Sequence, residues 1–376
     1  PIMNLSAGVQ SIAMAGTEAC AITSVGGVKC WDGTEEDPVD VEGLASGVAH
    51  LSMGSVSKCA LLADGIVKCW ARNNHGQLGN GEWTDREAPS PVLGLSAGIT
   101  DVSAGSYRTC ALTDSGDVRC WGANPVGDGS TDISSQPVPV SGLDGTTDSV
   151  SVGGGSCALL VETGDVSCWG GWGGSTTPTT VEGIVPGSPA PGNVRAIARG
   201  SRHTCVLNEN GGIRCWGANG SGQLGDGTTT DRATPVDVLG IDGLLPSLGF
   251  AVGLTAGENH TCAILRDPDA VACWGDNQYG QLNVGVPSGV VTQPMVVNGL
   301  DEPVASISAG YNHTCALTVE DGVSRVKCWG RGLPPESLTP AEVGSVGTGV
   351  ASIAVGHGHA CSLMHSGTVK CWGTTL

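Results

Sequence analysis

Cysteine is the residue type whose spacing most clearly suggests chemistry in this chain. The 376 residues contain 16 cysteines, which form eight close pairs with none left over. The pairs are Cys20 with Cys30, Cys59 with Cys69, Cys110 with Cys120, Cys157 with Cys168, Cys205 with Cys215, Cys262 with Cys273, Cys315 with Cys328, and Cys361 with Cys371. If the members of a pair lie opposite each other across a tight β-hairpin, their Cα atoms are about 4.5–5.5 Å apart, which is within disulfide range. We therefore predict eight cross-strand disulfides, each contributing about 2–3 kcal/mol through loop closure.

Other uses of the cysteines fit the spacing less well. Zinc sites need ligands about two to four residues apart, and redox catalysis needs Cys-x-x-Cys; neither spacing occurs. Buried, reduced thiols are the remaining alternative. Because disulfides persist in oxidising compartments, the pairs predict an extracellular, periplasmic or cell-surface protein.

A histidine stands two residues before the first cysteine in four of the eight pairs. These residues are His203, His260, His313 and His359, and their equivalents in the other pairs are Glu18, Ser57, Arg108 and Gly155. Converging imidazoles can bind a metal ion. A histidine that recurs with the motif is more simply a structural hydrogen-bonding residue, so we predict no metal site.

Two loops and one serine match ligand-binding or catalytic motifs only in part. Gly127–Ser130 and Gly225–Thr228 contain Gly-Asp-Gly, but the regular oxygen spacing of a calcium loop is missing, which favours turn capping by the aspartate. Gly153–Cys157 fails the last position of Gly-x-Ser-x-Gly, and no Gly-Lys-Ser or Gly-Lys-Thr exists for a phosphate loop. We predict no catalytic residue, no metal and no cofactor, in a protein that is not an enzyme.

The cysteine pairs belong to a repeat that indicates the fold. Each copy has a β-branched first strand such as Val304–Gly310, a second such as His313–Thr318, a turn, a third such as Val326–Gly330, and a Pro-led fourth such as Pro235–Val238. Four short strands in each repeat of about 40–50 residues are typical of β-propeller blades. We predict an all-β propeller of four-stranded antiparallel blades, eight in number, with seven as the alternative.

The two ends of the sequence predict how the ring closes. The last copy stops after its third strand, at Cys371–Leu376, and Pro1–Val9 matches the fourth-strand segment Pro91–Ile99. We expect the N-terminal strand to complete the last blade, which removes two free sheet edges. The expected single domain spans 1–376, with blades at 11–45, 46–98, 99–147, 148–194, 195–252, 253–304, 305–350, and 351–376 together with 1–10.

The full repeat reads Ala-Gly-x-x-His-Thr-Cys-Ala-Leu and then Val-x-Cys-Trp-Gly-x-Asn-x-x-Gly-Gln-Leu-Gly-x-Gly-Thr. It is best preserved at Arg202–Thr228, Asn259–Leu282 and Asn73–Gly81. This pattern resembles the regulator of chromosome condensation repeat family of β-propellers, which implies a propeller fold. Familiar members have seven blades, whereas this chain has eight Cys-Trp units. The paired cysteines resemble a secreted bacterial branch of the family more than its nuclear member.

Aromatic residues and glycosylation patterns supply the remaining candidates. The tryptophan after each second cysteine is expected to pack between neighbouring blades. Trp83 and Trp172 lie in loops outside the repeat, and the single phenylalanine, Phe250, ends a long apolar insertion; all three are candidate partner contacts. Sequences of the type Asn-x-Ser/Thr make Asn4, Asn219, Asn259 and Asn312 candidate glycosylation sites.

Composition narrows the function further. The formal net charge is −19 and only 17 residues are Lys or Arg, which argues against nucleic-acid binding; no apolar stretch is long enough to span a membrane. We predict a secreted or cell-surface scaffold that binds a protein partner or itself, with carbohydrate as a further ligand class. The alternatives are a structural subunit of an extracellular appendage or surface assembly, a secreted enzyme inhibitor, and a guanine-nucleotide exchange-type regulator.

Overall fold

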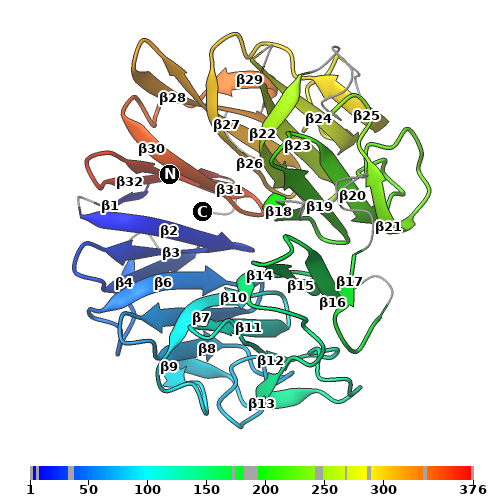
Figure 1. The fold of residues 1–376 in the computed structure, drawn as a ribbon. Helices are drawn as coiled ribbons and strands as arrows, with labels where there is room; N and C mark the ends of the chain where they lie inside the picture. The colour runs from blue at the N-terminus through cyan, green and yellow to red at the C-terminus, as the bar shows by residue number, and fades with distance from the viewer. Residues whose placement is uncertain are drawn as a thin grey trace.

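The protein is a ring of eight four-stranded antiparallel sheets (Figure 1). The computed structural model describes residues 3–5, 8–32, 38–171, 174–181, 194–241, 249–266, 269–285, 289–332 and 337–373. The prediction of an all-β propeller is confirmed, and the alternative of seven blades is wrong. No helix occurs in these ranges, and hence none that could cross a membrane.

Every blade orders its strands from the centre of the ring outward. The first, innermost strands are β2 (Val9–Ala15), β6 (Val48–Met53), β10 (Ile99–Ala104), β14 (Thr147–Val152), β18 (Val194–Arg199), β22 (Phe250–Ala256), β26 (Val304–Ala309) and β30 (Val350–Val355). The second strands are β3 (Glu18–Thr23), β7 (Ser57–Leu62), β11 (Arg108–Thr113), β15 (Gly155–Leu160), β19 (His203–Asn208), β23 (His260–Arg266), β27 (His313–Glu320) and β31 (His359–Met364). Blades one to eight are numbered in this order.

The third and fourth strands complete each sheet toward the outside. The third strands are β4 (Val28–Asp32), β8 (Val67–Ala71), β12 (Val118–Gly122), β16 (Val166–Gly170), β20 (Ile213–Gly217), β24 (Ala270–Asp276), β28 (Val323–Gly330) and β32 (Val369–Gly373). The fourth, outermost strands are β5 (Val39–Asp40), β9 (Arg86–Pro91), β13 (Ser134–Pro139), β17 (Thr179–Thr180), β21 (Arg232–Asp237), β25 (Val290–Val296), β29 (Ser337–Glu342) and β1 (Met3–Leu5).

The ring closes through the N-terminal strand, as predicted. β1 pairs antiparallel with β32, with Met3 opposite Cys371 and Leu5 opposite Val369. The two chain ends therefore lie on the same blade (Figure 1). This pairing joins the last blade to the first part of the chain and covers the outer edge of β32.

All sixteen cysteines form the eight predicted disulfides, one in each blade. Every bond joins a cysteine of the second strand to a cysteine of the third strand. The bonded pairs are Cys20 with Cys30, Cys59 with Cys69, Cys110 with Cys120, Cys157 with Cys168, Cys205 with Cys215, Cys262 with Cys273, Cys315 with Cys328, and Cys361 with Cys371. No free cysteine is left in the described chain, so the alternative of reduced thiols is wrong.

The disulfide geometry corrects one detail of the prediction. In each blade the two Cα atoms are 4.1 Å apart, closer than the predicted 4.5–5.5 Å of an unlinked pair. The two cysteines face each other directly across the strands, so the bond draws the backbones together. The pairs separated by 11 or 13 residues keep this register because their hairpins are longer: Cys157 with Cys168, Cys262 with Cys273, and Cys315 with Cys328.

The fourth strand differs in one detail from the sequence prediction. Pro235 was expected to begin this strand in blade five, but β21 begins three residues earlier, at Arg232, and Pro235 lies inside it. The pairing with β20 is irregular there, between Cys215 and Gly217. An outermost strand has one free edge, so the N–H group that proline lacks is not needed by a neighbour.

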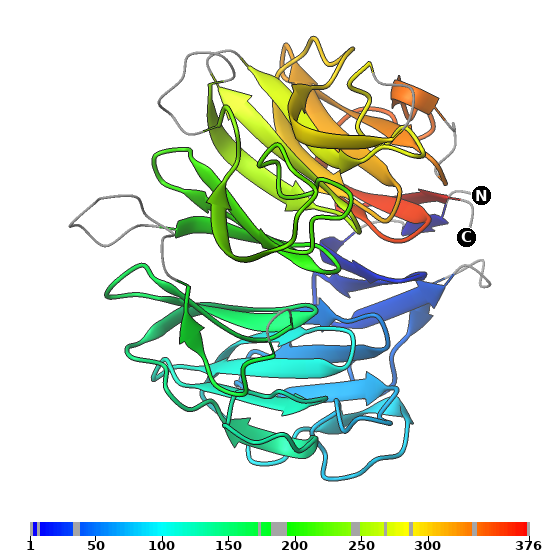
Figure 2. The ribbon, with the colours of Figure 1, turned by 90° about the vertical axis from the view of Figure 1, so that its right-hand side faces the viewer.

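The antiparallel order gives the ring two different ends. Loops from the first to the second strand and from the third to the fourth emerge at one end, which we call the His face because its histidines begin the second strands. The tight hairpins from the second to the third strand emerge at the opposite end, which we call the hairpin face. Figure 2 views the ring from the side, with these two ends separated by the length of the strands.

Candidate binding face and blade junctions

The blades approach one another most closely at glycines that follow the innermost strands. A Cβ at Gly257 would lie 2.4 Å from the carbonyl oxygen of Gly310, and one at Gly310 would lie 2.5 Å from that of Gly356. Real Cβ atoms do not tolerate such distances. The Ala-Gly of the repeat is therefore required by the contact between neighbouring backbones, next to the histidines.

At the junction of blades five and six, one main-chain carbonyl accepts hydrogen bonds from two side chains of the next blade. Trp274 Nε1 donates to the Gln223 oxygen at 2.9 Å, and Thr261 Oγ1 donates to the same oxygen at 3.0 Å. His203 Nε2 lies 2.9 Å from Thr261 Oγ1. Because the threonine proton is already used, His203 must be the donor, which makes it the neutral tautomer protonated at Nε2. We call this set of four groups the relay.

The relay recurs at the junction of blades six and seven. His260 Nε2 lies 3.0 Å from Thr314 Oγ1, which donates to the Gln281 oxygen at 2.9 Å, and Trp329 Nε1 donates to that oxygen at 2.8 Å. Burial lowers the pKa of His203 to about 4, with the positive charge of Arg199 adding to the effect. Burial and the neighbouring histidines lower the pKa of His260 to about 3. Both rings are neutral at physiological pH.

Blades seven and eight keep the histidine, but the next blade lacks the threonine that should face it. Ala360 and Ala19 stand opposite the repeat tryptophan of their own blades, where blade six has Thr261. Neither ring nitrogen of His313 or His359 forms a hydrogen bond of normal geometry within the described residues. Burial lowers the pKa of both histidines to about 4, partly offset by main-chain groups of neighbouring residues.

The structure does not bring the histidines together as metal ligands. Within the described ranges, no group of three or more His, Cys, Asp or Glu side chains is placed to hold a metal ion. His203 and His260 each bond to a threonine of the following blade instead. Their observed role is to join blades.

The Gly-Asp-Gly loop of blade five is organised from within. Asp226 accepts hydrogen bonds from Thr228 and from the Asn219 amide, and its other oxygen lies 2.8 Å from Arg232. Asn219 is fully buried, and its own oxygen accepts from the Leu224 N–H at 3.0 Å. The Asp226 carboxylate is therefore committed to the turn and to Arg232 rather than open to calcium.

The burial of Asn219 also corrects one glycosylation candidate. Its amide nitrogen donates to the loop around it and has no exposed surface, so a glycan cannot be attached to it in the folded domain. Asn259 and Asn312 are half-buried on the His face and stay predictions. The side chain of Asn4 lies outside the described residues.

The three partner-contact candidates have different outcomes. Trp83 is 46% exposed in the loop between β8 and β9, and Phe250 is 40% exposed at the start of β22. Trp172 lies outside the described residues. The eight tryptophans of the repeat are all buried, as predicted: Trp31, Trp70, Trp121, Trp169, Trp216, Trp274, Trp329 and Trp372.

Sequence reasoning missed an aromatic set on the His face. All three tyrosines of the chain lie in its loops. Tyr107 contacts the ring of His75 from the preceding blade, with centroids 4.8 Å apart, and Tyr311 stacks on His357 at 4.1 Å. The Arg331 guanidinium lies 5.2 Å from the centroid of Tyr279. The signal in the sequence was positional: each tyrosine follows a first or a third strand, and those strands end at the same face.

Tyr279 and Arg331 border a shallow cavity between blades six and seven. The cavity holds about 300 Å³ and is also lined by Gln278, Ser337 and Leu338. Leu338 is 64% exposed. The His face therefore presents aromatic, aliphatic and guanidinium groups together, a mixture that is enriched in protein–protein interfaces.

Comparison with protein families now places this ring among known propellers. One model of the regulator of chromosome condensation (RCC1) repeat matches residues 64–112, 210–264 and 270–317, and a second model of the same repeat matches 99–128, 194–223, 251–281 and 304–332. The two sets cover more than half of the chain. The chain belongs to the RCC1 repeat family. Blades one, four and eight fall outside these matches, and none of them carries Gly-Gln-Leu-Gly.

RCC1-repeat relatives match the chain over much of its length. The ultraviolet-B receptor UVR8 of Arabidopsis thaliana is 27% identical over 268 residues, covering 68% of this chain and 59% of the receptor. The chain thus spans less than two thirds of that relative. Human WBSCR16 superposes with a TM-score of 0.66 at 19% identity, covering 85% of this chain and 88% of that one. Yeast RCC1 (Prp20) superposes at 0.63 with 22% identity, covering 83% and 80%. At these identities the solved structures establish the fold.

Proposed function

We propose that this chain works in an oxidising compartment, secreted or at the cell surface, as a rigid and non-catalytic scaffold that binds a protein partner. The observation that carries the proposal is the disulfide at the same register of every blade. Such bonds are rare where thiols are kept reduced. A rigid surface also loses little conformational entropy when a partner binds.

We further propose that the partner binds at the His face. The tyrosines, Arg331 and Leu338 lie there, and large aromatic and guanidinium groups supply most of the binding energy in protein interfaces. The hairpin face is different in chemistry. Its turns carry exposed acidic residues in six of the blades: Asp64, Asp114, Glu162, Glu209, Asp269 and Asp321. A face covered by like charges favours solvation over contact with most proteins.

The compartment is tested by trapping thiols with a maleimide in the cells that make the protein, before lysis. We expect no added maleimide and an intact mass about 16 Da below the reduced value, because each of the eight disulfides lacks two hydrogens. Sixteen labelled cysteines would contradict the proposal and would make nucleotide exchange the first activity to assay.

The face is tested with a photo-crosslinking amino acid placed at single exposed positions of the native protein. We expect adducts from positions 107 and 311 on the His face and few from the matched apolar positions 25 and 161 on the hairpin face. Tyr107 and Tyr311 are 47% and 39% exposed, and Val25 and Val161 are 69% and 57% exposed. Lower solvent exposure therefore cannot explain fewer adducts on the hairpin face. Adducts mainly from the hairpin face would overturn the assignment. Adducts of twice the chain mass would favour a self-assembling structural subunit.

A further inference from the structure

The junction of blades four and five lacks the side chain that begins the second strand in every other blade. Gly155 stands where blade five has His203, since both residues face the glycine after the following tryptophan. The loop before it, Gly153–Gly154, is one residue shorter than its counterpart in blade five. The result is a cavity of about 280 Å³, lined among others by Ser156, Gly170, Arg199, Ser201, His203 and Trp216.

Arg199 lines this cavity and Arg108 lies behind its wall at Gly170. Both stand at positions that hold other residues elsewhere in the ring. Arg199 ends β18, where the equivalent residues in four other blades are Ala104, Val152, Ala256 and Ala309. Arg108 begins β11, where blades five to eight begin with histidine. Arg108 is 6% exposed. Its Nη1 would lie 2.8 Å from a Cβ at Gly170, so the guanidinium packs directly against this glycine of the cavity wall.

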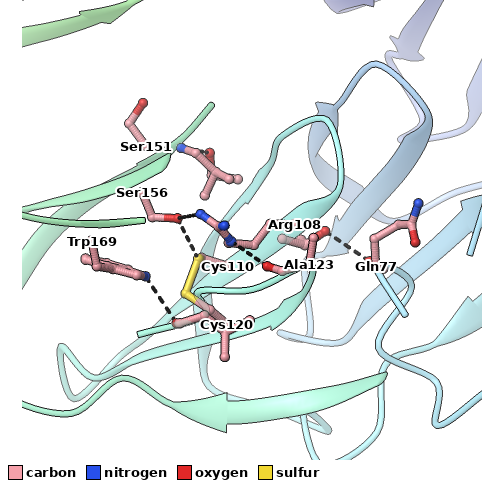
Figure 3. Close-up of a disulfide and its surroundings, with 12 residues drawn as sticks. Gln77, Arg108, Cys110, Cys120, Ala123, Ser151, Ser156 and Trp169 are labelled. Atoms are coloured by element: carbon pink, nitrogen blue, oxygen red, sulfur yellow. Dashed lines mark hydrogen bonds between the residues drawn. A yellow bond between two sulfur atoms is a disulfide. The ribbon is translucent and has the colours of Figure 1, made fainter. Parts of the chain in front are cut away.

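Both guanidinium groups are held by neutral acceptors only. Arg108 Nε donates to the Ala123 carbonyl at 2.8 Å, and its Nη1 lies 3.4 Å from Ser156 Oγ (Figure 3). Arg199 Nη1 contacts the Ser151 carbonyl at 3.5 Å and the Cys157 sulfur at 3.1 Å. No described carboxylate forms an ion pair with either arginine.

Some N–H donors of the two arginines therefore have no acceptor among the described residues. Each guanidinium has five N–H donors and no acceptor, and the buried Arg199 Nε has no partner among the described residues. Burial lowers the pKa of both arginines to about 10, which still leaves them charged at neutral pH. Arg108 is buried and Arg199 is half-buried. A charge removed from water without a counter-ion is unfavourable, and a negatively charged acceptor would offset that cost.

We propose that this cavity binds a small oxyanion, with Arg199 as the main contact and Arg108 behind Ser156 and Gly170 as the second positive charge. The planar guanidinium fork matches the oxygens of phosphate and carboxylate groups. The Ser156 and Ser201 hydroxyls line the same cavity and can donate to further oxygens. The site is independent of the protein partner proposed above.

The test compares thermal unfolding and calorimetric titration of the oxidised protein in phosphate, acetate and chloride at constant ionic strength. We expect phosphate or acetate, but not chloride, to raise the unfolding midpoint, and the preferred anion identifies whether the natural group is a phosphate or a carboxylate. Arg199→Gln should weaken binding of the preferred anion by about tenfold or more, because a charge-assisted contact is lost. Arg195→Gln, which removes an exposed charge from the same strand, is the matched control and should leave binding unchanged.

Two further results separate ligand binding from a structural role. In chloride alone, Arg199→Gln should not lower the unfolding midpoint, because it removes a half-buried charge that has no carboxylate partner among the described residues. Ser201→Trp, at an exposed residue of the cavity wall, should weaken anion binding while both arginines remain. An equal anion response in the wild type and Arg199→Gln, or no anion response in the wild type, would overturn the proposal.

Discussion

The junction between blades five and six and the junction between blades four and five are built from the same repeat but differ in what fills them. At the first, the relay ties His203 and Gln223 of blade five to Thr261 of blade six. At the second, Gly155 provides no imidazole, and Arg199 lines a cavity with Arg108 behind its wall. The comparison teaches that the repeat supplies a joint by default, and that replacing a few of its residues converts the joint into space for a ligand.

The apolar cores of the two junctions also differ, and the core at the blade five–six junction is the larger. Trp274 is fully buried in a core that continues through blades five, six and seven, while Trp216 is 8% exposed in a smaller cluster shared by blades four and five. Trp274 also donates to a carbonyl of the preceding blade. We therefore expect the blade four–five junction to be the weaker of the two.

In acid, the junctions that contain the buried histidines should become weaker than the blade four–five junction. This is the largest expected effect. The folded pKa values of His203, His260, His313 and His359 are lowered to about 3–4, while the unfolded value is about 6.5. The unfolded chain therefore binds more protons below pH 6.5, so stability is complete above that pH and falls as the pH drops toward 4. At pH 5 each histidine should account for about 2 kcal/mol. Chemical denaturation at pH 7.5, 6.5 and 5 measures the loss.

The histidines belong to blades five to eight. Blade four has Gly155 at the equivalent position. Hydrogen exchange, corrected for its intrinsic pH dependence, should therefore rise at pH 5 in blades five to eight first. His260→Gln should reduce the slope of stability against pH, whereas His365→Gln, at an exposed hairpin residue, should not. A slope that both variants leave unchanged would contradict the assignment.

Removing one tryptophan from each junction tests the packing directly. Trp274→Ala should destabilise the protein by about 3–5 kcal/mol, because it leaves a large cavity and removes one of the two hydrogen bonds to the Gln223 carbonyl. Trp216→Ala should cost less, since this ring is partly exposed and already borders a cavity. The measurement is the free energy of unfolding in guanidinium at pH 7.5. Equal losses would show that the two junctions are equally strong.

A smaller effect isolates the relay from the packing. Thr261→Val keeps the shape but removes the hydroxyl that accepts from His203 and donates to Gln223, and it should cost about 1–3 kcal/mol. Thr204→Val is the matched change in blade five, where Gly155 of the preceding blade offers no imidazole. It should have a smaller effect on the denaturation midpoint. A larger effect at Thr204 would argue against the relay.

The smallest expected effect is a gain in stability when the threonine of the relay is restored in blade eight. Ala360→Thr places a hydroxyl where Thr261 and Thr314 carry theirs, opposite His313, whose Nε2 has no partner in the described structure. One new hydrogen bond should raise stability by about 0.5–1.5 kcal/mol. Ala360→Val, of similar size, controls for packing. A valine that stabilises as much as threonine would show that the hydroxyl plays no part.

Much of the fold could be predicted from local features of the sequence. The spacing of Cys110 and Cys120 placed them opposite each other on a hairpin. The match of Pro1–Val9 to the fourth-strand segment Pro91–Ile99 identified β1 as the missing strand of blade eight. These features depend on strand periodicity and turn length within a few residues. The extent of β21 was less predictable, because proline is tolerated inside an outermost strand as well as at its start.

The candidate sites could be predicted only in part. The sequence located the histidines two residues before the first cysteines. It could not show that His203 bonds to a threonine 58 residues away or that neither ring nitrogen of His313 has a partner among the described residues. It marked Trp83 and Phe250 as exposed candidates but gave no reason to group the three tyrosines. That grouping requires knowing which loops share a face.

The sequence by itself determined the blade pattern, the disulfide pairing and the family, because each follows from short-range spacing that repeats along the chain. The tertiary structure alone decided the rest: which relays are complete, that Asn219 is buried, and that Arg199 lines a cavity near Arg108 with no carboxylate of the described residues paired to either. The physical reason is that these properties belong to contacts between blades. Such contacts depend on which side chain the ring places opposite another, and residues about 50 positions apart carry no local signal of that meeting.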